Sequence, residues 1–193
     1  VWLTLEDVVL DWRRAALLRG RLVVNRLAAG SISLPRLPQA QEDEGIDLPQ
    51  PEAPGFSLPE LPVSVNIGEI SAPSVSIGEP VFGIASEFSL DGSLRLEGGE
   101  GAADFEIVRT DGPEGIFDIG ASYSNETGVL DLSLDFSEQP GGVLATLAGI
   151  PGEPSVDLDV QGEGPLDDFE ATLSLSTDDI ERLVGTLNIG GAG

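Results

Sequence analysis

The chain has 193 residues, of which 40% are hydrophobic and 5% aromatic, and it contains no cysteine, histidine or methionine. Without histidine and cysteine it has no Ser-His-Asp triad, no thiol nucleophile and no thiolate or imidazole metal ligand, so we expect neither an enzyme nor a bound cofactor. The formal net charge of −25 argues against nucleic-acid binding, which requires clustered cations.

The charge is distributed unevenly along the chain. Six of the nine arginines and three acids lie in the first 36 residues, which gives 6 − 3 = +3 there and −25 − 3 = −28 for the remainder. Acids that alternate with apolar residues on a strand normally form its solvated face, and we interpret most of the acidity in this way.

Residues 1–34 are predicted to form a strand, a short helix and two further strands. The extended stretches VWLTL and DVVLDW come first, RRAALLRG has the composition of a helix, and RLVVNRL and GSISL are again extended. A helix this short is not stable alone and must pack against a sheet. Its arginines would suit anionic lipid headgroups, but an ordinary solvated helix face is the favoured interpretation.

Residues 35–62 are predicted to form a loop or an extended excursion. This stretch holds seven prolines and a cluster of acids. Proline lacks the backbone N–H that a ladder of strands needs, so a regular sheet is not expected here.

Residues 63–193 carry the strongest pattern in the sequence. Apolar residues recur at every second position in VSVNI, FSL, SLRL, FDIGASY, DLSLDF, VDLDV, FEATLSL and LVGTLNI. Turns are expected at Asp91-Gly92, Gly98-Gly99, Asp111 to Pro113, Asn125 to Gly128 and Gly162 to Pro165. The pattern predicts a long, twisted, mostly antiparallel sheet with one apolar face, interrupted by a short helix near 141–149.

The residues alone leave open what covers this apolar face. A second sheet, neighbouring repeats or a curled groove that holds an apolar ligand would each bury it. The predicted interior is mainly Leu, Ile and Val, which suits acyl chains and an ordinary core equally well. On composition alone a packed core is favoured.

Several phrases of the sequence, in their order, resemble one known family. They are LTLEDVVLDWRRAALLRGRLVVNRLAAGSISLPRLP at residues 3–38, PELPV at 59–63, LAGIPG at 147–152 and GEGPLDDF at 162–169. They are similar to the N-terminal part of the TamB family, the inner-membrane-anchored subunits of the translocation and assembly module, which belong to the AsmA-like bridge-like lipid transfer proteins. Members of that family are far longer and begin with a membrane anchor, so we expect this chain to be a piece whose anchor lies outside it.

The resemblance implies a β-sheet curled into a taco-like hydrophobic groove that spans the periplasm. It further implies phospholipid transport between the inner and the outer membrane, support for outer-membrane protein assembly and secretion, and a barrel partner similar to TamA. Phospholipid acyl chains would then contact the inward residues of the later strands. These are Phe117, Ile119, Leu130, Leu132, Leu134, Phe136, Val156, Leu158, Val160, Leu173 and Leu175.

The alternative function is a structural or adhesive extracellular β-repeat region without lipid transport. Acids such as Asp157 and Asp159 would then bind calcium, but the sequence lacks the glycine- and aspartate-rich repeat typical of such sites. The adjacent acids Asp167-Asp168 and Asp178-Asp179 are interpreted as turn residues rather than as a catalytic carboxylate pair, because neighbouring side chains on a strand point apart.

Overall fold

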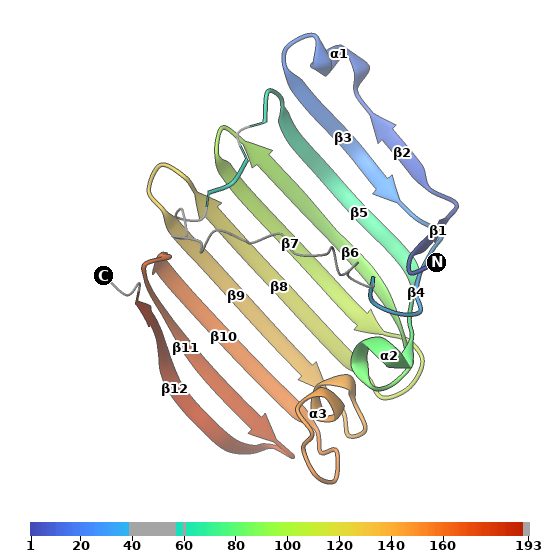
Figure 1. Ribbon diagram of the computed structural model, residues 1–193, viewed down its shortest axis with the longest axis vertical. Coiled ribbons are helices and arrows are strands. Elements are labelled where there is room, and N and C mark those ends of the chain that lie inside the picture. The colour runs from blue at the N-terminus through green and yellow to red at the C-terminus, as the bar shows by residue number, and fades with distance from the viewer. Residues whose placement is uncertain (39–56, 60, 191–193) are drawn as a thin grey trace, which may run out of the picture.

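The computed structural model describes residues 1–38, 57–59 and 61–190, which form one open 12-stranded sheet with three short helices (Figure 1). The first strands are β1 (Thr4–Glu6), β2 (Val9–Trp12), β3 (Arg21–Ala28), β4 (Ser31–Leu34) and β5 (Ser64–Ile77). The following ones are β6 (Ser86–Glu97), β7 (Glu100–Arg109), β8 (Gly115–Ser124), β9 (Val129–Glu138), β10 (Val156–Pro165), β11 (Asp168–Thr177) and β12 (Ile180–Gly190). The helices are α1 (Arg14–Leu17), α2 (Glu79–Phe82) and α3 (Val143–Leu147).

The sheet is an antiparallel meander from β5 to β12, and the first four strands are joined to it through parallel pairing with β5. Both β3 and β4 pair with β5 in parallel, while β2 pairs with β3 and β1 with β4 in antiparallel fashion. A parallel pair needs a long connection, and the stretch between β4 and β5 is long enough to provide it. The predicted fold class, a mostly antiparallel twisted sheet, is confirmed.

Two of the three helices coincide with the predicted ones. Helix α1 lies within RRAALLRG and α3 lies within 141–149. Helix α2 was not predicted, because a single turn of four residues is too short to give a helical apolar period. Both α2 and α3 connect strands at the same end of the sheet (Figure 1), which we call the helix end.

The turn predictions were correct at three places and wrong at two. Gly98-Gly99, Asp111 to Pro113 and Asn125 to Gly128 connect strands as expected, whereas Asp91-Gly92 and Gly162 to Pro165 lie within β6 and β10. A Cβ on Gly92 would lie 2.3 Å from the Phe105 ring, and one on Gly162 would lie 2.5 Å from the Phe169 ring. These glycines make room for aromatic rings of neighbouring strands rather than for turns.

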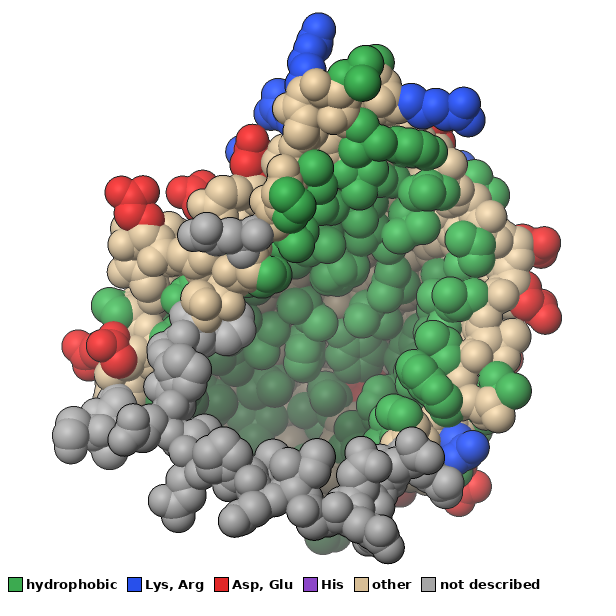
Figure 2. All heavy atoms as spheres, turned by 45° about the horizontal axis from the view of Figure 1, so that its top comes forward, with side chains coloured by type: hydrophobic (Ala, Val, Ile, Leu, Met, Phe, Trp, Pro, Cys, Tyr) green, Lys and Arg blue, Asp and Glu red, His purple; other side chains and the backbone are tan. Residues whose placement is uncertain are grey.

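The two faces of the sheet differ in character. Figure 2 shows hydrophobic side chains gathered over a hollow, with acidic side chains projecting around its outside. We call the hollowed apolar side the concave face and the opposite side the outer face. On β9, for example, Leu132, Leu134 and Phe136 are half-buried whereas Asp131 and Ser133 are exposed, as the two-residue period of a strand requires.

Candidate functional site

All the residues predicted to line a groove lie on the concave face, on the neighbouring strands β8 to β11. Phe117 and Val156 are buried and the other nine are half-buried. The strand register places them opposite one another: Ile119 faces Leu134, which faces Val160, which faces Leu173. Residues that are distant in sequence are thereby brought into one surface.

The apolar surface continues across strands on both sides of this set. One cross-strand row runs over eight strands and consists of Ala72, Leu90, Ile107, Phe117, Phe136, Leu158, Leu175 and Leu183. At the usual strand spacing of about 4.8 Å, its seven intervals span about 34 Å. A phospholipid tail occupies half of a hydrocarbon core about 30 Å thick, so this row is longer than one extended tail.

The helix end of the concave face is covered by α2 and α3. The rings of Phe82, Phe88, Phe117 and Phe136 follow one another edge to face, with centroids 6.5, 6.1 and 5.6 Å apart. Val143 and Leu144 of α3 pack against this aromatic run. A cavity of about 300 Å³ lies between the two helices and the sheet, and its lining is entirely apolar and includes Leu147. This volume is at the lower limit of known small-molecule pockets.

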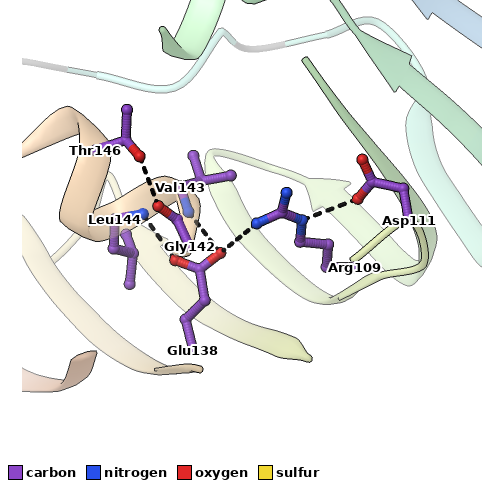
Figure 3. Close-up of polar contacts among 7 residues, drawn as sticks. All are labelled: Arg109, Asp111, Glu138, Gly142, Val143, Leu144 and Thr146. Atoms are coloured by element: carbon purple, nitrogen blue, oxygen red, sulfur yellow. Dashed lines mark hydrogen bonds and ion pairs between the residues drawn. The ribbon is translucent and has the colours of Figure 1, made fainter. Parts of the chain in front are cut away.

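A buried ion-pair network connects α3 to the sheet (Figure 3). The side chains of Arg109 and Glu138 are only 3% and 1% exposed, and Arg109 Nη1 lies 3.5 Å from Glu138 Oε1. The backbone amides of Val143 and Leu144 donate to the two carboxylate oxygens of Glu138 at 2.7 Å each. Glu138 therefore holds the first turn of α3 against the sheet and satisfies amides that the short helix leaves unpaired.

Asp111 completes this network at the end of β7. Arg109 Nε donates to Asp111 Oδ1 at 2.9 Å. Burial raises the pKa of the Asp111 carboxyl, but the hydrogen bond from Arg109, a hydrogen bond from the backbone of Glu87 and the guanidinium charge together outweigh burial and leave the pKa below its usual value. The carboxylate thus stays ionised and balances part of the buried positive charge.

Gly142 allows the carboxylate of Glu138 to reach the helix. A Cβ at this position would lie 2.0 Å from the carboxyl carbon of Glu138. The Gly142 carbonyl also accepts a hydrogen bond of 2.8 Å from the hydroxyl of Thr146 (Figure 3). Any larger residue in place of Gly142 would displace either α3 or Glu138.

At the end of the strands opposite the helix end, the segment around Leu58 is hydrogen-bonded to Asn125. The backbone N–H of Leu58 donates to Asn125 Oδ1 at 2.7 Å, and Asn125 Nδ2 donates to the Leu58 carbonyl at 2.9 Å. The Leu58 side chain lies over Gly101, where a Cβ would be 2.8 Å from Leu58 Cδ1. Residues 57–59 are thus attached to the sheet beside the concave face. Most of the proline-rich segment 35–62 lies outside the described residues.

The outer face carries a row of acids that lie directly opposite one another on adjacent strands. The row consists of Asp91, Glu106, Asp118, Asp135 and Asp159. Like charges in directly opposed positions destabilise a sheet. Within the described ranges, no group of three or more acidic side chains is arranged to hold a metal ion.

Sequence reasoning missed the polar residues at both ends of the concave face. Arg109 follows Phe105 and Ile107 at the next inward position of its strand, and Glu138 likewise follows Leu134 and Phe136. A charged residue at a position where the alternation predicts an apolar one is the sequence signal that could have identified both. Asn125 was interpreted as a turn residue, and nothing local connects it to Leu58, which is 67 residues away.

The geometry combines an extended apolar surface with a buried polar network at its helix end. The ionisable groups of this network contact one another and α3, and the cavity beside them is lined only by aliphatic and aromatic side chains. No helix in the described part of the chain is long and apolar enough to cross a membrane. Comparisons with protein-family models, with curated proteins and with solved structures found no match to this chain.

Proposed function

We propose that this chain is a segment of a periplasm-spanning protein that conducts phospholipids between the inner and the outer membrane along its concave face. The observation that carries the proposal is the continuous apolar row across eight strands. Among the described residues, α3 packs over the middle of this row at Phe117 and Phe136, whereas Leu183 at its end is 52% exposed. A surface of this kind is rarely left to water in a protein that has no apolar partner.

The physical basis is the transfer of acyl chains from water to an aliphatic surface. Each methylene group removed from water contributes about 0.8 kcal/mol. The half-buried leucines of the concave face, such as Leu132 and Leu134, would provide this contact while the open side leaves a charged headgroup in water. A lining of apolar side chains offers no polar group that would fix a tail at one position along the row, and this suits movement of a tail from strand to strand.

The wider role follows from the resemblance to the TamB family alone. Under this proposal the chain lies in the periplasm, a segment outside it anchors the protein to the inner membrane, and a TamA-like outer-membrane barrel is the partner. Support for the assembly and secretion of outer-membrane proteins belongs to the same proposal.

Photocrosslinking tests the lipid path directly. A photoreactive residue is placed at Leu132 or Leu134 on the concave face, and at Ser133 or Asp135 on the outer face of the same strand as matched controls. Phospholipid is expected to crosslink from the two concave positions and not from the two outer ones. Equal crosslinking from both faces, or none from either, contradicts the proposal, and protein crosslinks alone would favour the structural or adhesive alternative.

A further inference from the structure

The connection between β2 and β3, which includes α1, carries the opposite charge to the rest of the protein. Residues 12–22 contain Arg13, Arg14, Arg19 and Arg21 and no acid, so this stretch has a charge of +4, against −25 − 4 = −29 for the remaining chain. Figure 1 places α1 at one extremity of the molecule, and Figure 2 shows cationic side chains projecting from that extremity. We call residues 12–22 the arginine tip.

The arginine tip contains a cavity whose polar lining is cationic. It has a volume of about 270 Å³ and is lined by Arg13, Arg19 and Arg21 together with Ala15, Ala16 and Val23. Neither Arg13, Arg14 nor Arg19 forms an ion pair with any residue that the structure describes. Among the described residues Arg21 forms an ion pair only with Glu97, at 3.6 Å, and the two side chains are 60% and 39% exposed. Three guanidinium groups around one small space form a geometry that suits a phosphate, because arginine recognises phosphate oxygens through its forked donors.

Exposed leucines lie beside these arginines. Leu17 is 41% exposed and Leu18 is 90% exposed, at the end of α1 and immediately before Arg19. Transfer of a leucine side chain with this exposure from water to an apolar phase lowers the free energy. Cations that flank exposed leucines are the combination found on protein surfaces that lie on anionic bilayers.

We propose that the arginine tip docks on an anionic bilayer surface, with Arg13, Arg19 and Arg21 around the phosphate of one phospholipid and Leu17 and Leu18 inserted at the level of the upper acyl chains. The complementarity of charge selects this partner, because the rest of the chain carries a net charge of −29, which an anionic membrane repels. The inference goes beyond the proposed lipid path and does not depend on it. Docking would place the first strands of the sheet next to the membrane.

Vesicle co-sedimentation of the 193-residue chain tests this proposal. The expected result is binding to phosphatidylcholine vesicles that contain phosphatidylglycerol and little binding to vesicles of phosphatidylcholine alone. The double variant Arg13→Gln/Arg19→Gln should bind the anionic vesicles about 30-fold more weakly, since each arginine near such a surface contributes about a factor of five. The matched control is Arg26→Gln/Arg95→Gln, which removes the same charge from two exposed ion pairs elsewhere and should bind nearly as the unmodified chain does.

The leucine contribution is tested separately. Leu18→Ser is expected to weaken binding to the anionic vesicles about tenfold without a change in the circular dichroism spectrum, because Leu18 is almost fully exposed.

Other outcomes overturn the inference. Binding that is independent of phosphatidylglycerol and unchanged in Arg13→Gln/Arg19→Gln would mean that the concave face adsorbs to lipid. Saturable binding of inorganic phosphate at the tip without vesicle binding would identify a site for a free anion. Capture of an acidic protein by the tip, again without vesicle binding, would identify a protein interface.

Discussion

Replacement of Glu138 by alanine tests whether the buried network holds the helix end together. The substitution leaves Arg109, 3% exposed, with only Asp111 as a partner, and it removes the acceptor of the Val143 and Leu144 amides. Breaking a buried ion pair from one side costs about 3–5 kcal/mol. The two unpaired amides add to this, although not additively, so we expect a loss near the upper end of that range. This is a large part of the total stability of about 5–15 kcal/mol that a domain usually has.

The assay is urea unfolding followed by far-ultraviolet circular dichroism, with two comparison variants. Glu163→Ala removes an exposed glutamate from the same sheet and should change the free energy of unfolding by less than about 0.5 kcal/mol. The double variant Arg109→Ala/Glu138→Ala should be more stable than the sum of the single changes predicts, by about 1–3 kcal/mol, because it removes both buried charges. A loss below about 1 kcal/mol for Glu138→Ala would refute the reasoning, since α3 would then not depend on this carboxylate.

Three further predictions concern the two faces of the sheet and the end of β7. Leu134→Arg should lower the free energy of unfolding by only about 1–2 kcal/mol, because the half-buried position lets the guanidinium reach water. The control Ser133→Arg, on the exposed face, should be nearly neutral in thermal unfolding. Global unfolding of Leu134→Arg would instead indicate a sealed core. Asp118→Asn should stabilise the protein at low salt by about 0.2–1 kcal/mol, which is measured as a higher melting temperature. This gain should vanish near 1 M salt, and a gain that persists there would speak against charge repulsion. The lowered pKa of Asp111 contributes stability that is fully present above about pH 4 and is lost as the pH falls through the pKa of the folded state. The melting temperature of Asp111→Asn should therefore fall less steeply with decreasing pH in the acidic range than that of the unmodified chain. An unchanged pH dependence would contradict this.

The sequence by itself determined the local order of the strands and the side of the sheet on which each residue lies. Leu132, Leu134 and Phe136 share a face because side chains on a strand alternate, and this needs no knowledge of the neighbouring strand. The turn at Asp178-Asp179 was likewise predictable, since aspartate tolerates the left-handed backbone angles, φ 50° and 59°, that both residues adopt.

Tertiary structure alone decided that β3 and β4 both pair in parallel with β5, and which polar groups meet. Gly92 and Gly162 were mistaken for turn residues because the reason for a glycine there is an aromatic ring on the adjacent strand. The ion pair between Arg109 and Glu138 joins two strands that are not adjacent in the sheet, and its burial depends on how α3 folds over it. A local period of two residues carries no information about register between strands or about what covers a face, because both depend on contacts between residues that are distant in the sequence.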